Sequence, residues 1–172
     1  MLGRVCAELA TRQVSHALIG AAALATHGVS RSTHDIDLLT VEADCLAPEF
    51  WSNLRRQGVE VDARRGDAVD PLAGVVRFNA PGERPVDLVV GKGPWQRLAL
   101  GRSLAGEFIG IALPVLRAAD LILLKLFAGG PQDAWDVTQL LAAGDRERLV
   151  AEVEEHLRDL PSRCATLWQQ IR

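Results

Sequence analysis

The stretch from Gly20 to Thr40, GAAALATHGVSRSTHDIDLLT, holds the residues best suited to chemistry. Asp35 and Asp37 lie two residues apart in an apolar, strand-forming run. Because side chains alternate between the two faces of a strand, both carboxylates are expected on one face. Like charges there repel each other unless a cation lies between them, and a hard divalent ion such as Mg²⁺ prefers such oxygen ligands. A solvated pair of Asp side chains at a strand end is the alternative interpretation.

A second feature lies upstream, where Gly20 ends an expected strand and begins an expected helix. The N-terminus of a helix offers free backbone N–H groups and a positive dipole end, which suit a phosphate. This junction gains weight from the Asp pair that follows it and from Arg31 and Thr33 in the connecting loop. Together these features predict a site for a phosphate-bearing ligand and a metal ion.

These residues resemble a known family. Gly20 and Ala21, followed by Asp35-Ile36-Asp37, resemble the hG(G/S)…DhD signature of the DNA-polymerase-β-like nucleotidyltransferase superfamily. Within it, the phrase ALATHGVSRSTHDIDLL is most similar to the small bacterial AbiEii and minimal-nucleotidyltransferase type, often found in toxin–antitoxin loci. The resemblance implies a third carboxylate on a neighbouring strand, and Asp87 in RPVDLVV is the matching position. Taken alone, Asp87 could also be an ordinary strand-edge residue.

The resemblance continues in DLILLKLFAGGPQDAWDVTQLL, which is similar to an AbiEii-type motif with KLxA followed by D-x-x-D. It implies that Lys125, Asp133 and Asp136 lie near the active site. Lys125 also falls on an apolar helix face, where an ammonium needs a partner or a phosphate. The alternatives are a snorkelling Lys125 and two Asp side chains that complement the helix dipole after Pro131.

Two positions depart from the family pattern. Ala21 stands where Gly or Ser is usual, so that its backbone N–H remains but no side chain contacts the phosphate. Gly130 stands where Arg is common in the tail motif. Both departures favour a second hypothesis, in which the chain is a catalytically inactive nucleotidyltransferase-fold protein that acts as a binding partner in a toxin–antitoxin pair.

The elements that must position these residues follow from periodicity and from Gly and Pro punctuation. Alternation of helices and strands, followed by a helical tail, predicts an α+β fold. The resemblance implies a nucleotidyltransferase-fold mixed sheet flanked by helices, with a core at 1–115 and a C-terminal helical segment at 116–172 packed on it. We expect helices at 3–13, 21–27, 46–57, 117–128, 131–143 and 145–158, and strands at 16–19, 36–41, 59–63, 74–79, 86–90 and 108–113.

Composition excludes several classes of protein. The chain has 172 residues, enough for one domain with a real core, and 19 Lys plus Arg against 22 Asp plus Glu give it no global charge for binding nucleic acid. Its apolar runs are shorter than the roughly 18 residues that span a bilayer, and the N-terminal segment does not resemble a signal peptide. Three widely spaced Cys form no disulfide framework. We therefore expect a cytoplasmic protein that does not bind membranes.

The resemblance implies a metal-dependent nucleotidyltransferase that moves a nucleoside monophosphate from an NTP to a hydroxyl of an RNA end or a protein. Mg²⁺ or Mn²⁺ would be the cofactor, and a cognate antitoxin or toxin a partner. Absence of GxSxG, P-loop and HExxH motifs leaves serine hydrolases, P-loop enzymes and zincins without support. The candidate catalytic and metal-binding residues are Asp35, Asp37 and Asp87. The candidate substrate-binding residues are Gly20, Ala21, Arg31, Thr33, Lys125, Asp133 and Asp136.

Overall fold

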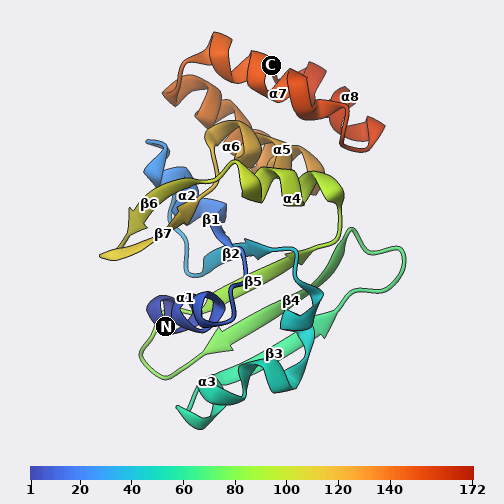
Figure 1. The fold of residues 1–172 in the computed structure, drawn as a ribbon. Coiled ribbons are helices and arrows are strands. Elements are labelled where there is room, and N and C mark those ends of the chain that lie inside the picture. The colour runs from blue at the N-terminus through green and yellow to red at the C-terminus, as the bar shows by residue number, and fades with distance from the viewer.

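A computed structural model describes residues 1–172 as one mixed β-sheet with helices on both sides (Figure 1). The strands are β1 Ala17–Ile19, β2 Ile36–Thr40, β3 Glu60–Arg65, β4 Leu72–Asn79, β5 Val86–Gly91, β6 Leu104–Phe108 and β7 Ile111–Val115, in the order β3-β4-β5-β2-β1-β7-β6. The α-helices are α1 Leu2–Thr11, α2 Gly20–Thr26, α3 Ser52–Arg56, α4 Pro94–Gly101, α5 Ala118–Ala128, α6 Pro131–Ala143, α7 Arg146–Leu157 and α8 Ser162–Ile171, with short 3₁₀ helices η1 Ala43–Leu46 and η2 Pro48–Trp51.

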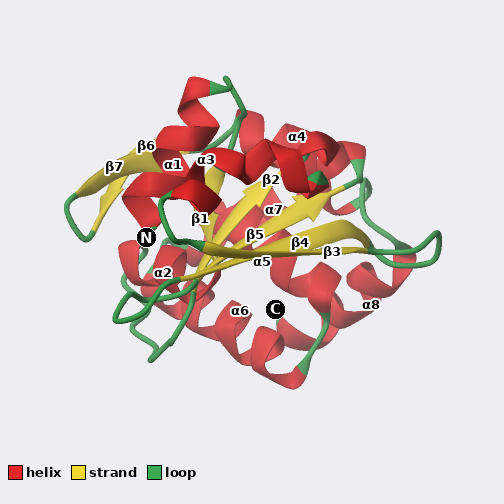
Figure 2. Ribbon diagram, turned by 90° about the horizontal axis from the view of Figure 1, so that it is seen from below, coloured by secondary structure: helices red, strands yellow, loops and turns green.

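The two faces of the sheet are covered differently. Helices α1 and α3 lie on one side, and α5 to α8 lie on the other (Figures 1 and 2). Strand β5 shows how the sequence divides between these faces. Its Val86, Leu88 and Val90 are fully buried, whereas Asp87 and Val89, which point to the opposite face, are half-buried. Polar positions on the central strands thus gather on one face.

One hydrophobic core joins the sheet to the C-terminal helices. A cluster of 43 buried residues runs from Leu2 through the central strands to Trp168. The segment 116–172 is therefore packed on the sheet, while its description as a separate unit stays a prediction. None of the helices is both long enough and apolar enough to cross a membrane.

Most of the predicted elements are present, and the α+β prediction is confirmed. Three differences have local causes. The expected helix at 46–57 is two 3₁₀ turns followed by the short α3, with Pro48 beginning the second turn. The strand expected at 108–113 is a hairpin, β6–β7, whose turn residues Ile109 and Gly110 both have positive φ. Helices α4 and α8 were not predicted; both segments were left without an element.

Candidate active site

The three predicted carboxylates come together on the polar face of the sheet. Strand β2 pairs in parallel with β5, and Asp37 lies directly opposite Asp87 in that register. Asp35 lies in the bend just before β2, two residues from Asp37. The apolar neighbours of these residues, Ile36 and Leu88 among them, are buried on the opposite face, so the pleat aims all three carboxylates to one side.

Gly20 is shaped by its contact with this group. It follows β1 directly as the first residue of α2 and has a φ of +64°, in the left-handed region that favours glycine. A Cβ atom at this position would overlap the Asp37 carboxylate at Oδ2. The predicted strand–Gly–helix junction is thus present and packs directly against a candidate catalytic acid. The side chain of its neighbour Ala21 is buried in the protein at 2% exposure.

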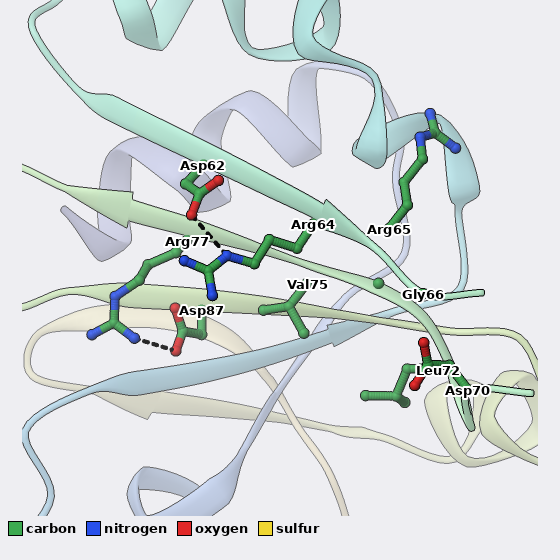
Figure 3. Close-up of a pocket in the computed structure, with 10 residues that line it drawn as sticks. Asp62, Arg64, Arg65, Gly66, Asp70, Leu72, Val75, Arg77 and Asp87 are labelled. Carbon is green, nitrogen blue, oxygen red and sulfur yellow. Dashed lines mark hydrogen bonds and ion pairs between the residues drawn. The ribbon is translucent and has the colours of Figure 1, made fainter.

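Arg77 on β4 is a component of the site that the sequence analysis missed. It lies opposite Asp87 in the antiparallel β4–β5 register. Its Nη1 donates to Asp87 Oδ2 at 3.0 Å, as Figure 3 shows, and its Nη2 donates to Asp35 Oδ2 at 3.2 Å. One guanidinium therefore bridges two of the three carboxylates. The sequence offered one signal for it. Arg77 is the single charged residue of a mostly apolar strand, at a position that alternates with buried residues.

The electrostatics show that this group is short of positive charge. Burial, together with the charges of Asp87 and Asp35, raises the pKa of Asp37 to about 6. Burial also raises the pKa of Asp87, with the Arg77 guanidinium opposing the shift and Asp35 adding to it. A raised carboxyl pKa in a polar recess is typical of functional sites, because the charged form lacks compensation there.

The donor set fits a hard divalent cation in its chemistry. All three side chains offer carboxylate oxygens, the ligands that Mg²⁺ and Mn²⁺ prefer. Asp35 Oδ1 and Asp87 Oδ1 are buried and have no hydrogen-bond partner. Buried polar atoms without a partner are rare and need an explanation, and an absent ion is one. No three His, Cys, Asp or Glu side chains are, however, already arranged as a formed metal site.

A second charged cluster joins α5, α6 and the loop before β2. Lys125 Nζ lies 2.8 Å from Asp133 Oδ1 and 2.7 Å from Asp136 Oδ2, and Arg31 Nε lies 3.6 Å from Asp136 Oδ1. Burial lowers the pKa of Lys125, but hydrogen bonds from its ammonium to the two carboxylates raise it overall. Four of the predicted substrate-binding residues are thus brought together, with their charges already directed at one another.

Thr33, also predicted to bind substrate, contacts the protein backbone. Its Oγ1 donates to the carbonyl oxygen of Asp35 at 2.9 Å. This bond holds the loop that carries Asp35 into β2, so in this structure Thr33 positions the first carboxylate through the main chain.

Two cavities meet at the carboxylates, and Leu72 lines both. We call the first the apolar cavity: it measures about 420 Å³ and is lined by Ile19, Gly20, Asp37, Pro71, Leu72, Val89, Gln96, Leu121, Leu124, Lys125, Phe127, Ala128 and Arg163. We call the second the arginine cavity: it measures about 650 Å³ and is lined by Asp62, Arg64, Arg65, Gly66, Asp70, Leu72, Gly74, Val75, Arg77 and Asp87 (Figure 3). An apolar pocket with a few convergent polar groups is the usual form of a small-molecule site.

Gln96 is the polar feature of the apolar cavity wall that the sequence analysis missed. Its side chain is fully buried, and its Oε1 accepts a hydrogen bond from the Gly93 N–H at 2.8 Å. That bond fixes the orientation of the amide and leaves Nε2 as a buried donor without a partner. On the same wall the Phe127 ring is held between Trp95 and the Arg163 guanidinium.

Proteins with a similar fold were found among solved structures. No protein-family model and no curated protein matches the sequence. An antigenic nucleotidyltransferase-like protein from Paracoccidioides brasiliensis matches with a TM-score of 0.55 and 15% identity over 95% of this chain and 89% of that one. ANT(2″)-Ia in complex with adenylyl-2″-tobramycin matches with a TM-score of 0.58 and 14% identity, covering 91% and 95% of the two chains.

A third match is the lincosamide antibiotic adenylyltransferase LnuA in its lincomycin-bound form, with a TM-score of 0.51 and 9% identity over 83% of this chain and 96% of that one. At such identities the likeness concerns the fold. It agrees with the mixed seven-stranded sheet and with the helices packed on it. The chain therefore has the nucleotidyltransferase fold, which the resemblance of its motif had led us to expect.

Proposed function

We propose that this protein is a metal-dependent nucleotidyltransferase that moves a nucleoside monophosphate from an NTP to an acceptor hydroxyl. The observation that carries the proposal is the group of Asp35, Asp37 and Asp87, which has three carboxylates and a single bridging cation, Arg77. Such an excess of buried negative charge is unfavourable unless a divalent cation completes it. The nucleotidyltransferase fold supports the same activity.

In this proposal Asp35 and Asp37 hold Mg²⁺ or Mn²⁺ through their carboxylate oxygens, and Asp87 completes the metal site. A bound divalent ion would neutralise the phosphates and stabilise the charge that develops on the leaving oxygen. The carboxylate of Asp37 packs where a side chain at position 20 would lie, and the backbone N–H groups of Gly20 and Ala21 beside it would contact the triphosphate. Arg31 and Lys125 would add positive potential from their cluster with Asp133 and Asp136.

The transfer itself is an in-line displacement at the α-phosphorus. The acceptor oxygen forms a bond to that phosphorus while the bond to the oxygen bridging the α- and β-phosphates breaks, and pyrophosphate leaves. The hydroxyl proton passes to the carboxylate of Asp87, whose raised pKa suits a general base. Arg77, which donates to Asp87, would hold that carboxylate in place.

The apolar cavity is the best candidate for the nucleoside. Asp37 lies at this cavity, so an α-phosphate near the carboxylates leaves its base beside Phe127 and Gln96. A planar base fits an apolar, aromatic wall, and the free Gln96 Nε2 donor would bind a carbonyl or ring nitrogen on its edge.

The arginine cavity is the best candidate for the acceptor, and we favour an RNA end. Arg64, Arg65 and Arg77 line it beside Asp87, and Arg65 makes no ion pair in the structure. Guanidinium groups bind phosphates well, and the unpaired Arg65 favours a phosphate-bearing acceptor over a polycation such as the tobramycin of the adenylyl-2″-tobramycin bound to ANT(2″)-Ia. An RNA acceptor also agrees with the AbiEii or minimal-nucleotidyltransferase subtype and with a toxin–antitoxin role, in which a cognate protein would be the partner.

A catalytically inactive binding protein is the second candidate. Arg77 favours it, because this residue already neutralises part of the negative charge that a metal would balance. Ala21, whose side chain is buried and cannot reach a phosphate, favours it as well.

The test uses purified protein with Mg²⁺ and each α-³²P-labelled NTP in turn. Total RNA, lysate protein and tobramycin are offered as separate acceptors. We expect label on RNA with wild-type protein and none with Asp35→Ala. The exposed Asp44→Ala, the same substitution outside the site, is the matched control and should keep full transfer. No label on any acceptor, together with no Mg²⁺-dependent NTP binding, would overturn the enzyme proposal in favour of the inactive partner.

A further inference from the structure

We propose that Arg77 is a built-in cation that takes the place of one divalent ion at the three carboxylates, so that the nucleotide-free protein binds a single divalent ion. This inference rests on the metal role proposed above. It distinguishes the site from a two-metal site, in which two divalent ions stabilise the attacking and the leaving oxygens. Arg77 belongs to no sequence motif, and the pairing of β4 with β5 fixes its position in the site.

Geometry gives Arg77 a fixed place among the carboxylates. Its guanidinium contacts Oδ2 of Asp87 and Oδ2 of Asp35 through two different nitrogens, a fork that one ammonium could not reproduce. The cross-strand register opposite Asp87 keeps its Cα beside the site. The contacts occupy one oxygen of each carboxylate and leave each Oδ1 buried and without a hydrogen-bond partner.

Asp37 is the member of the group that Arg77 does not contact. No hydrogen bond or ion pair involves its carboxylate, although it is half-buried, packs against Gly20 and lies opposite Asp87 in the strand register. The need for a cation is therefore greatest on the Asp37 side. A single divalent ion would bind there, with Oδ1 of Asp35 and Oδ1 of Asp87 as additional donors, while Arg77 remains on the two Oδ2 atoms.

The charges support this division. Three carboxylates carry three negative charges, and Arg77 contributes one positive charge. One divalent ion then brings the group to neutrality, whereas two ions beside Arg77 would leave an excess of two positive charges in a half-buried site, an arrangement that costs free energy before any phosphate is present. No three of the acids are arranged as a formed metal site, which agrees with the Arg77 guanidinium occupying part of the space among them.

Arg64 provides a matched control. It lies on the adjacent strand and lines the same cavity, but its Nε pairs with Asp62 Oδ2 at 3.0 Å rather than with the three carboxylates (Figure 3). Removing Arg64 therefore removes an arginine from the same cavity without changing the cation that touches Asp35 and Asp87. A general effect of surface charge would appear in both variants, and the proposed effect in only one.

The experiment counts bound Mn²⁺ by electron paramagnetic resonance in nucleotide-free protein, for wild type, Arg77→Met and Arg64→Met. Methionine keeps an apolar stem in the strand, and circular dichroism confirms the fold of each variant. We expect one Mn²⁺ in wild type and in Arg64→Met. Arg77→Met should bind a second Mn²⁺, or bind the first about tenfold more tightly, because a neighbouring positive charge is gone. Should Arg77→Met not fold, Arg77→Gln, which also removes the charge, takes its place with the same expected result.

Several outcomes would overturn the inference. Two Mn²⁺ ions in wild type would show that Arg77 replaces none, and an unchanged or weaker Mn²⁺ affinity in the Arg77 variant would show that it only positions the acids. Either result leaves the proposed metal dependence intact. Absence of Mn²⁺ binding in all three proteins would instead overturn the metal role in the proposed function together with this inference.

Discussion

The molecule has two clusters of aspartates, which differ in how far neighbouring cations compensate their negative charge. Asp133 and Asp136 face Lys125 and Arg31, so that two carboxylates meet two cations. Asp35, Asp37 and Asp87 meet only one cation, Arg77. The first group has as many cations as carboxylates and is balanced in charge, whereas the second has one cation for three carboxylates.

The pKa shifts of the two clusters reflect this difference in charge compensation. In the balanced cluster, hydrogen bonds to the acids overcome the effect of burial and raise the pKa of Lys125, which stabilises its charged form. In the other cluster the pKa of Asp37 rises to about 6, which means that its charged form is disfavoured. The comparison agrees with a contribution of the first cluster to helix packing and with the ligand site that we propose at the second.

The largest expected effect comes from Asp37→Asn. This change removes a proposed metal ligand while it keeps the size of the side chain, and we expect transfer to fall at least about a thousandfold, the scale of losing a central electrostatic group. Because the buried charge disappears, the free energy of unfolding should stay equal or rise. Labelled-NTP transfer and urea unfolding measure the two effects. Retained transfer would mean that the unbalanced cluster is not the reacting centre.

In the balanced cluster the same logic predicts a loss of stability. Asp136 is fully buried, so Asp136→Ala leaves Lys125 and Arg31 without their shared partner and should cost about 3 kcal/mol in the free energy of unfolding. Asp133, at 21% side-chain exposure, is the control, and Asp133→Ala should cost about 1 kcal/mol. Denaturant titration ranks the two variants. Equal costs would mean that burial does not distinguish the two carboxylates.

A third expectation concerns pH. The pKa of Asp37 is near 6 in the fold against 3.8 ordinarily, so the folded protein keeps a proton that the unfolded chain releases in this window. Stability of the metal-free protein should therefore fall by about 2 kcal/mol from pH 4 to pH 6, relative to Asp37→Asn. The raised pKa of Asp87 acts in the same direction. Thermal unfolding of both proteins across this range provides the measurement. Parallel curves for the two proteins would remove the evidence for an uncompensated Asp37.

Much of the unbalanced cluster was open to prediction from sequence because its determinants are local. The period of a strand places Asp35 and Asp37 together, and a glycine is required where a chain turns from β1 into α2. The position of Asp87 came from the family resemblance, and the parallel register opposite Asp37 agrees with it. Lys125 was expected to find a partner or a phosphate, and it has two protein partners.

Arg77 and Gln96 were not predicted, because both depend on relations between distant segments. Arg77 belongs to the site only because of the antiparallel register of β4 on β5, which neither strand reveals by itself. Gln96 lies in α4, a helix that was not predicted. Its Oε1 accepts a hydrogen bond from the Gly93 N–H, and this bond leaves its Nε2 without a partner. Residues set by pairing register and capping thus escape motif analysis, even when they lie beside the motif.

The smallest expected effect concerns Gln96 and would extend the comparison to the apolar cavity. Gln96→Met removes the unpaired Nε2 donor, and we expect about fivefold weaker binding of a non-hydrolysable NTP, the value of one hydrogen bond. Ribose 5′-triphosphate, which lacks a base, should bind both proteins equally.

Gln96→Glu separates the donor from the cap, since a carboxylate can still accept from the Gly93 N–H but cannot donate when charged. Calorimetry at pH 8 should therefore show weakened NTP binding in both variants, whereas urea unfolding should show a larger loss of stability in Gln96→Glu, which buries a carboxylate, than in Gln96→Met. Equal weakening for ribose 5′-triphosphate would mean that Gln96 acts on the phosphates or the fold, and that the base lies outside the apolar cavity.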